Sequence, residues 1–524
     1  MWNHLPSEKK QKYQTLITNF ASLSEAFAQK SEGDMDTVAP IVNSKFQETV
    51  FQRAFDAVAE DISNSSYDAS IRLSEEKKYL IGIKSFGIGS GDQKIAQFKA
   101  DSAANNWAKT FERISERAHR ASTKEEADSL NHDDYLVLAT QLAELRNARI
   151  ESSKEMLKGF RASGDTKVEA VYHVLMPSKK GDKPQIHVGE TTYASVDIEN
   201  IKILGSTTKN NPTNFSFEDG IHKYKYTSAD SQLLMTFNNS DIVVETWDVH
   251  YVDDAFALFE HLHERTSELK KDPWNNVIDS VSWMLTNADG QVEVSSGFNA
   301  WDGAPKTSKD QRKNTIDRLM LDLPEVASVE NARKIVNGMT DLLLNGNFNK
   351  ARRDRVISEV ESLNDYDITM RVKKALYRPV SELYIPVPDA RNWNTNHPDF
   401  FGKGVGLLKS DNPKKLALDK DNRTFKMEFL ASGDVVDAFL TQDYGKGIQS
   451  LGDQQILGEW ILRGVFQLGE REPLTAKRLT ELHINAIRMN KYEDDERGIG
   501  MEFIWIDPEN PPKDAWGWVA KSTF

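Results

Sequence analysis

The chain has no cysteine among its 524 residues. Disulfide bonds, thiolate zinc sites and cysteine nucleophiles are therefore excluded, and any metal ion must bind oxygen or histidine ligands. The sequence also lacks an apolar run of the length that crosses a bilayer, about 20 residues. Its first ten residues, Met-Trp-Asn-His-Leu-Pro-Ser-Glu-Lys-Lys, have neither an apolar signal core nor a cleavage site. We therefore expect a cytoplasmic protein with no membrane partner.

Positive charge is also scarce, because 66 Lys and Arg residues stand against 80 Asp and Glu residues and give a net charge of −14. Since neutralising phosphates requires Lys and Arg, this deficit weighs against a nucleic-acid partner. A basic cleft in an acidic surface avoids that objection, and weak nonspecific binding suits a sequence-specific protein. The length and the 28% of charged residues are typical of a globular protein with two or three domains.

Two strand-like apolar runs near the start of the chain carry the first candidate site. The first covers residues 65–73 and the second residues 78–86, and the polar turn Ser74-Glu75-Glu76-Lys77 separates them. A twisted hairpin brings Asp68, near the start of the first run, close to Lys84, near the end of the second. Asp68 and the carbonyl oxygen of Ile83 are oxygen ligands of the kind that Mg²⁺ prefers, and a metal-bound water can attack a phosphodiester.

This arrangement resembles the PD-(D/E)xK core of many restriction endonucleases, in which a strand acid is followed by x-x-Lys on the next strand. The family's second acid, two residues before the lysine, is replaced here by Gly82. Some members take that acid from a neighbouring helix, and Glu48, on a predicted helix over residues 44–55, is the candidate in this chain. The resemblance implies Mg²⁺ as cofactor, with Asp68, Ile83 and Glu48 as ligands and Lys84 as a catalytic cation.

The rest of the first half reads as α/β or α+β with a mixed sheet, over residues 1–272. The glycine-rich segment 87–92 leads into a predicted helix from Gln93 to about Arg120, on which Gln93 and Gln97 are candidates for contacts with DNA phosphates or with water around the metal. Helices are also predicted over residues 7–30, 133–160 and 252–270, and strands over 168–176, 192–203, 215–217, 224–227, 233–237 and 242–247.

The second half contains three ordered motifs. Residues 281–303 read as a hairpin with its turn at Ala288-Asp289-Gly290, followed by the loop Ser-Gly-Phe-Asn-Ala-Trp. The segment Leu-Tyr-Ile-Pro-Val-Pro occupies residues 383–388, and residues 442–462 run from Gln-Asp-Tyr-Gly-Lys-Gly to Ile-Leu-Gly-Glu-Trp-Ile-Leu.

In this order the motifs resemble the B3-like pseudobarrel with which restriction enzymes such as EcoRII and BfiI read DNA, and most closely the C-terminal half of NgoFVII-type endonucleases. Residues 273–524 are accordingly predicted to form a mostly-β DNA-recognition domain. The resemblance implies two arms in the major groove, at residues 297–306 and 442–455, which pair with base edges. The implied contacts are Asn299, Trp301, Asp302, Gln442, Asp443, Tyr444, Lys446 and Gln449, with Arg391, Asn392, Trp393 and Asn394 as weaker candidates.

Two features depart from the family pattern. Ala300 interrupts the Asn-Trp pair of the first loop, and a helical insertion near residues 313–375 separates that loop from the Tyr-Ile-Pro strand. The insertion contains the most basic segments of the chain, residues 349–355 and 371–374. Three interpretations stay open for these segments: an extended DNA contact, a bridge between domains, or a solvated helix face.

The combined prediction is a Type II restriction endonuclease that hydrolyses double-stranded DNA with Mg²⁺. Such a function implies a DNA methyltransferase in the same system, and a homodimer is left open. The first alternative is a DNA-binding protein whose N-terminal half is a degenerate nuclease scaffold, which Gly82 favours. The second is an oligomeric scaffold without a nucleic-acid role, which the acidic composition favours.

Overall fold

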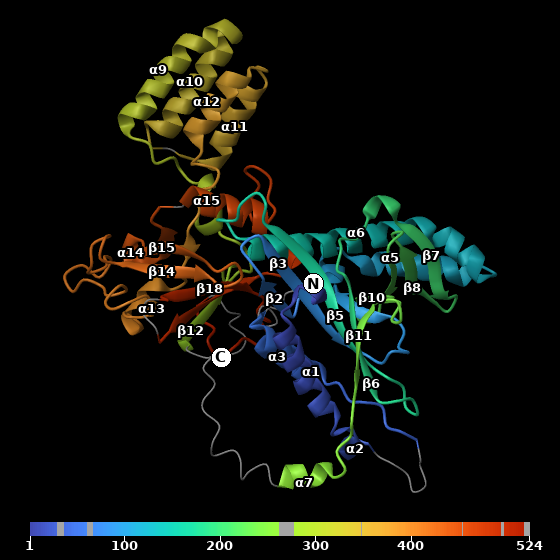
Figure 1. Ribbon diagram of the computed structural model, residues 1–524. Helices are drawn as coiled ribbons and strands as arrows, with labels where there is room; N and C mark the ends of the chain where they lie inside the picture. The colour runs from blue at the N-terminus through green and yellow to red at the C-terminus, as the bar shows by residue number, and fades with distance from the viewer. Residues whose placement is uncertain are drawn as a thin grey trace.

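The computed structural model describes residues 1–28, 36–59, 67–260, 277–346, 348–452, 454–493 and 497–517. These residues form three β-sheets, with helices packed around them and a separate group of four helices (Figure 1). Among the described residues, none of the helices combines the length and the apolar character needed to cross a bilayer.

The first sheet is mixed and has the strand order β1-β2-β3-β5-β6-β11. Its central pair, β3 and β5, is parallel, while β2 and β3 form the predicted antiparallel hairpin. The bounds of the six strands are β1 Val58–Ala59, β2 Ala69–Arg72, β3 Lys77–Ser85, β5 Lys167–Pro177, β6 Gln185–Thr192 and β11 Val243–Asp248.

A second, antiparallel sheet has the order β4-β10-β9-β8-β7. It includes Gln93–Gln97, so the prediction that Gln93 starts a helix is wrong: this segment pairs with β10, and long-range strand pairing overrides its local helical character. The strands are β4 Gln93–Gln97, β7 Lys202–Thr208, β8 Asn211–Glu218, β9 Lys223–Thr227 and β10 Gln232–Met235. The first half therefore contains two sheets rather than one.

The mixed sheet is buried on both faces. One face packs against α1 and α3 around Tyr13, Phe51, Ile81 and Leu175, and the other faces α5, α6 and the second sheet around Leu80, Tyr172 and Val174. The helices of this half are η1 Trp2–His4, α1 Ser7–Ala21, α2 Ser24–Phe27, α3 Ser44–Phe55, α4 Lys99–Ala104, α5 Trp107–Arg120, α6 Lys124–Lys158, η3 Ile198–Asn200 and α7 Ala255–Glu260. The predicted helix over residues 252–270 is described only as α7, and its later part lies outside the described residues.

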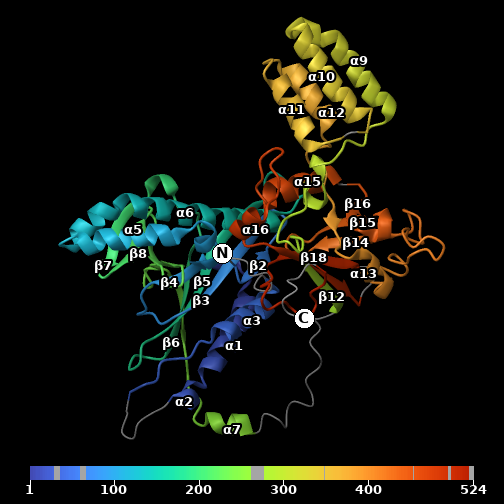
Figure 2. The same cartoon turned by 180° about the vertical axis from the view of Figure 1, so that it is seen from behind.

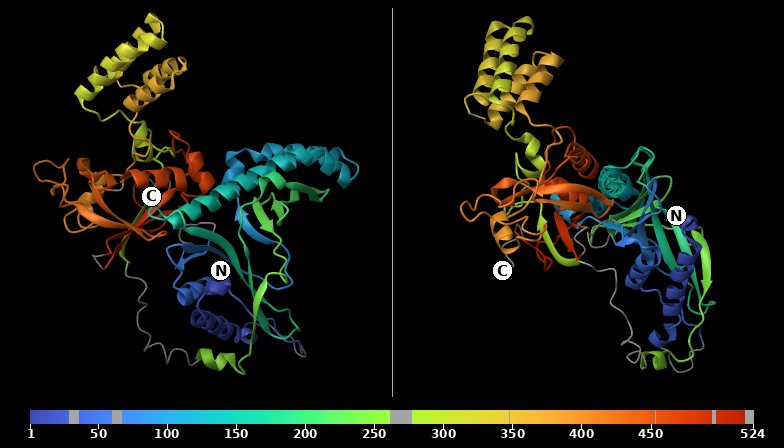
Figure 3. Two further views of the ribbon diagram at one scale, coloured as in Figure 1. Left: turned by 45° about the horizontal axis from the view of Figure 1, so that its top comes forward. Right: turned by 60° about the vertical axis from the view of Figure 1, so that its left-hand side comes forward.

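Helix α6 joins the two halves, as the left view of Figure 3 shows. Its C-terminal part is hydrogen-bonded to the second half, because the indole of Trp460 donates to the Glu155 carbonyl at 2.8 Å and the Ser152 hydroxyl donates to the Val465 carbonyl at 2.7 Å. From the other side, the guanidinium of Arg72 donates to the carbonyl of Leu430 at 2.6 Å.

The third sheet is a curled half-barrel of seven strands in the order β12-β17-β18-β14-β15-β16-β13 (Figure 1). Its strands are β12 Val277–Met284, β13 Ile385–Pro386, β14 Thr424–Phe429, β15 Asp434–Leu440, β16 Gly447–Ser450, β17 Ala486–Tyr492 and β18 Ile499–Ile504. The helical segments around it are η5 Gly297–Asp302, α13 Ala390–Asn396, α14 Gln442–Gly445, α15 Gln454–Glu459, η6 Trp460–Val465 and α16 Ala476–Leu482.

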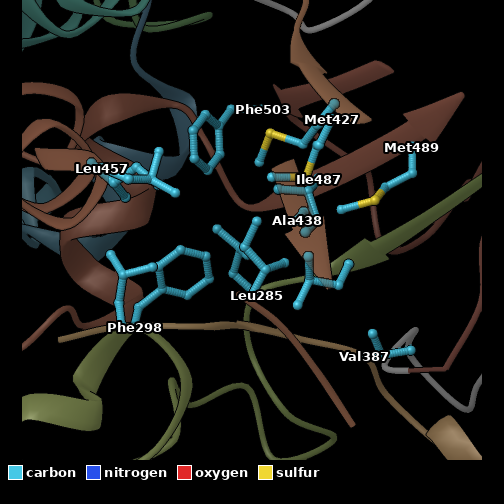
Figure 4. Packing of buried hydrophobic residues seen from close by; sticks show 14 of the residues in the cluster. Leu285, Phe298, Val387, Met427, Ala438, Leu457, Ile487, Met489 and Phe503 are labelled. Atoms are coloured by element: carbon cyan, nitrogen blue, oxygen red, sulfur yellow. The ribbon is translucent and has the colours of Figure 1, made fainter. Parts of the chain in front are cut away.

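The hairpin predicted after residue 281 is only half present. The turn forms, with the Asn287 amide donating to the Gln291 carbonyl at 2.8 Å, but no strand follows it and β12 pairs with β17 instead. The segment after the turn enters the core, where Phe298 lies beside Leu285 and Leu457 (Figure 4).

Four helices project from this sheet as a separate bundle, which is clearest in Figure 2. They are α9 Lys309–Val326, α10 Val329–Leu343, α11 Lys350–Glu361 and α12 Tyr366–Leu376, in the region predicted as a helical insertion. Their core is built from apolar residues of all four helices, among them Leu323, Ile335, Val356 and Val372. The bundle is thus an apolar unit with its own core.

The buried histidine of β5 gives an expected pH dependence of stability. His173 is fully buried, and burial lowers its pKa to about 3, from an ordinary value of about 6.5. Because the unfolded chain binds this proton more readily, stability is lost as the pH falls from about 6.5 toward 3, by up to about 1.4 kcal/mol per pH unit. Urea unfolding between pH 4 and 6 measures this effect. As the pH falls, the free energy of unfolding should decrease less steeply in His173→Gln than in the unsubstituted protein, and equal slopes for the two proteins would contradict this.

Candidate functional site

Asp68 and Lys84 are brought to the same end of the β2–β3 hairpin. Asp68 immediately precedes β2, and its Oδ2 accepts a hydrogen bond from the backbone amide of Ile83 at 2.5 Å, so the carboxylate lies next to the residue before Lys84. Lys84 is half-buried, and its ammonium has no ion pair or hydrogen bond to any other described residue. A carboxylate and an uncommitted cation therefore stand on adjacent strands.

Glu48 does not join them. It lies on α3, which covers one face of the mixed sheet, and its carboxylate pairs with Lys45 at 2.9 Å. Lys84 is the register partner of Val174, whose side chain belongs to the core on the opposite face. The prediction that Glu48 supplies the second acid beside Lys84 is therefore wrong.

Among the described residues, the candidate metal ligands at the hairpin therefore include one predicted carboxylate, that of Asp68. Within the described ranges, no group of three or more His, Asp or Glu side chains is placed to hold a metal ion. Mg²⁺ is often held by only one or two protein carboxylates, with water and substrate phosphate as the other ligands. Asp68 and the neighbouring Ile83 carbonyl fit this limited role, in which most of the coordination shell comes from solvent and substrate.

The structure gives a physical reason for Gly82, the residue at the family's second-acid position. Gly82 is the register partner of Tyr172, and a Cβ atom built on Gly82 would lie 2.8 Å from the Tyr172 ring. Tyr172 stacks on Tyr193 with the ring centres 4.0 Å apart. The space that an acid would need at position 82 is therefore filled by an aromatic stack.

The sequence prediction missed Arg146, which lies behind this stack. Its side chain is 2% exposed and its guanidinium carbon lies 4.6 Å from the Tyr193 ring centre, while its Nη1 donates to the Ala194 carbonyl at 2.8 Å. The available signal was its spacing, since Arg146 follows Leu138 and Leu142 at four-residue intervals on the buried stripe of α6. A permanent positive charge is thus held beneath the hairpin.

In the second half, the three motifs come together at one end of the half-barrel. The Tyr384 amide donates to the Gly297 carbonyl at 3.2 Å, and β13 pairs with β16 through Ile385 and Ile448. The hydroxyls of Ser296 and Tyr384 are 2.7 Å apart. Segments separated by about 150 residues of sequence are therefore neighbours in space.

The first predicted arm is buried over residues 297–303, and its exposed residues, Ala304 and Lys306, lie at its end. Asn299, Trp301 and Asp302 are all buried. The Asn299 side-chain amide donates to the Leu474 carbonyl at 3.0 Å, and its oxygen accepts from the Leu474 backbone amide at 2.8 Å. Asp302 is bound to Arg353 and Lys350 of α11, at 2.6 and 3.0 Å. The prediction that these three side chains contact bases is corrected: they hold the loop and the helical bundle in place.

The second predicted arm is exposed in part. Gln442, Asp443 and Lys446 are exposed, whereas Tyr444 and Gln449 are half-buried. Asp443 and Tyr444 have positive φ angles of 64° and 65°, which are uncommon for residues other than glycine and mark a strained turn.

Neighbouring segments hold this turn in place. The amide of Asn394, which is fully buried, donates to the Tyr444 carbonyl at 2.6 Å, and the Tyr444 amide donates to the Lys414 carbonyl at 3.0 Å. Asn394 therefore supports the turn. Trp393 is also buried, but it packs against Phe400 and Trp516, while Arg391 and Asn392 are exposed on the same helix, α13.

Exposed cations surround the second arm. Lys409, Lys414, Lys415 and Arg391 make no ion pair with another described residue, and Lys446 pairs only with Asp443, at 3.2 Å. By contrast, the basic segments of the insertion are largely paired within the protein, as with Arg352 and Asp341 at 2.9 Å and Arg371 with Asp322. The surface near the second arm is the better candidate for phosphate contacts.

Two predicted contacts near the hairpin have other roles in the structure. Gln93 donates to the Gly91 carbonyl at 2.8 Å, and Gln97 accepts from Lys94 at 3.0 Å and donates to the Asp230 carbonyl at 3.1 Å. Both lie on strand β4 of the second sheet, and their side-chain amides are hydrogen-bonded within the protein.

Comparison of the sequence with protein-family models and with curated proteins finds no match. The functional interpretation therefore depends on the geometry of the hairpin and of the exposed arm.

Proposed function

We propose that the protein is a metal-dependent deoxyribonuclease that cleaves double-stranded DNA at a specific sequence. The observation that carries this proposal is the hairpin, where the Asp68 carboxylate accepts the Ile83 amide hydrogen beside the half-buried Lys84, whose ammonium pairs with no residue in the described part of the chain. An acid and a cation at this spacing are suited to the hydrolysis of a phosphodiester. That reaction develops negative charge on the phosphate oxygens, which a cation stabilises.

Each side chain has a distinct role in the proposal. Asp68 and the Ile83 carbonyl contribute oxygen ligands, and a bound Mg²⁺ would supply a water of lowered pKa and neutralise phosphate charge. Lys84 donates hydrogen bonds to the scissile phosphate and orients the attacking water. Arg146, buried beneath the hairpin, adds a positive potential that favours the phosphate.

Sequence recognition is assigned to the exposed turn of residues 442–446 and to α13. Its Gln and Lys side chains are suited to base edges, and the unpaired lysines around it are suited to phosphates. The strained backbone of Asp443 and Tyr444 supports this assignment, because such strain is retained where a defined surface is needed.

A second candidate function is sequence-specific DNA binding without cleavage. It is favoured by Gly82, where the Tyr172 ring fills the acid position, and by the absence of a three-carboxylate or histidine cluster among the residues that the structure describes. Incubation of supercoiled plasmid with the protein, with Mg²⁺ and with EDTA, separates the two. Nicked or linear product only with Mg²⁺ supports the nuclease, whereas retarded but uncut plasmid supports the DNA-binding protein.

Substitutions at the second arm should separate base contacts from phosphate contacts. We expect Lys446→Ala or Gln442→Ala to cost roughly 1–3 kcal/mol of binding free energy at a single base pair of the site. Lys414→Ala and Lys415→Ala should instead weaken binding to all sequences. Each should also reduce the slope of log affinity against log salt concentration by about one. Fluorescence anisotropy with the site and its single-base variants, at several salt concentrations, makes the comparison. If Lys446→Ala lowers the affinity for all of these sequences equally, Lys446 contacts a phosphate and not a base.

A further inference from the structure

One cavity lies between the two halves of the chain, and none of its lining residues belongs to the second arm. It has a volume of about 720 Å³, within the range of small-molecule sites, which often lie at domain boundaries. The first half contributes α3, β2 and α6, and the second contributes β14, β17, β18 and Trp460. Any ligand bound there would contact both halves.

The walls and the floor of this cavity differ in chemistry. Phe55, Phe429, Trp460 and Phe503 provide apolar and aromatic walls. The floor is polar, because Glu502 of β18 and Asn490 of β17 lie beside each other and the Asn490 amide donates to Glu502 Oε1 at 3.3 Å. This combination suits a flat, largely apolar ligand with polar groups on one edge.

The polar floor has unused acceptors. Glu502 Oε2 and Asn490 Oδ1 have no hydrogen-bond partner among the described residues, and burial raises the pKa of Glu502 even though Arg488 lies nearby. The hydroxyl of Tyr492, which also lines the cavity, has no described partner, and its ring lies under the Arg497 guanidinium at 3.7 Å. A ligand edge with two donors beside one acceptor would satisfy these groups.

The rim carries positive charge. Arg53, at the end of α3, is exposed and its guanidinium has no partner in the described part of the chain, whereas Lys9 pairs with Asp56 at 2.6 Å and Arg497 with Glu428 at 2.9 Å. A cationic ligand is disfavoured by this rim, and an anionic tail directed toward Arg53 is favoured.

We propose that this cavity binds a guanine nucleotide, with the base against Glu502 and Asn490 and the phosphate toward Arg53. Guanine presents two N–H donors and an adjacent carbonyl on one edge, which match the carboxylate and the Tyr492 hydroxyl. Adenine and cytosine place a ring acceptor beside their amino group, and the carboxylate repels it. The site does not depend on the proposed nuclease function.

Isothermal titration of the full chain with GMP, AMP and CMP tests the proposal. GMP should bind at least tenfold more tightly than AMP or CMP. Glu502→Gln should weaken the affinity for GMP at least tenfold, because the new side-chain amide would place an N–H group against an N–H group of guanine. The control Glu509→Gln lies on an exposed turn and should bind GMP with the affinity of the unsubstituted protein. Arg53→Ala should lower the affinity for GMP but leave the affinity for guanosine, which has no phosphate, unchanged. Thermal unfolding of each variant shows whether it is folded.

A competition experiment distinguishes a free nucleotide from a base within nucleic acid. A single-stranded oligonucleotide with one guanine should displace GMP if the cavity accepts a base from nucleic acid, and should leave it bound if the cavity serves a free nucleotide. Absence of GMP binding at millimolar concentration, or equal affinity for GMP and AMP, overturns the proposal without any variant. An unchanged GMP affinity in folded Glu502→Gln also overturns it.

Discussion

Asp68→Asn is expected to abolish Mg²⁺-dependent DNA cleavage while leaving site-specific DNA binding intact. Asparagine retains an oxygen that can accept the Ile83 amide hydrogen, which Asp68 Oδ2 now accepts at 2.5 Å, so the hairpin should keep its geometry. It removes the negative charge that a hard divalent cation requires. The effect should therefore fall on catalysis and not on folding.

Lys84→Gln should reduce the cleavage rate by roughly 100- to 1,000-fold, the usual effect of removing one group that stabilises transition-state charge. Glu76→Gln is the matched control, because Glu76 is exposed in the turn of the same hairpin. Cleavage rates from single-turnover assays and affinities from gel retardation should be measured on the same DNA. Cleavage by Asp68→Asn or Lys84→Gln at the unsubstituted rate contradicts the catalytic assignment.

Arg353→Met is expected to lower the free energy of unfolding by about 3–5 kcal/mol, because it removes the buried partner of the Asp302 carboxylate and leaves it only the exposed Lys350. Arg353 and Asp302 are 1% and 3% exposed, with 2.6 Å between Nη2 and Oδ1, and they attach the helical bundle to the half-barrel. The neighbouring Arg352 pairs with Asp341, but these side chains are 44% and 43% exposed. Arg352→Met should therefore cost less than about 1 kcal/mol.

Urea unfolding of both variants provides the measurement. The double variant Asp302→Leu/Arg353→Met should be more stable than the sum of its single substitutions predicts, because no buried charge is left unpaired. If Asp302 instead reads a base, as the sequence suggested, Asp302→Asn should change DNA specificity and leave stability unchanged. Equal, small losses for Arg353→Met and Arg352→Met would exclude the anchoring role.

The sequence predicted those features that depend on local pattern. The turn after Leu73 and the apolar runs on either side of it indicated the β2–β3 hairpin, and the helical insertion predicted near residues 313–375 corresponds to α9–α12. The three motifs of the second half were also recognised as a group, and the structure places them side by side.

Features that depend on distant partners were not accessible in this way. Gln93–Gln97 is a strand because β10 lies beside it, and Glu48 is separated from Lys84 by a sheet whose faces could not be assigned from one strand. Asn299 and Asp302 are polar residues in a Gly-rich loop, which usually indicates exposure. Only their partners, Leu474 and Arg353, reveal them as buried anchors.

The most direct measurement is digestion of a phage genome by the purified protein with Mg²⁺, followed by sequencing of the fragment ends. The account predicts discrete fragments whose ends share one sequence, and no such ends with Asp68→Asn. Intact DNA with the unsubstituted protein, or the same ends with Asp68→Asn, would contradict it.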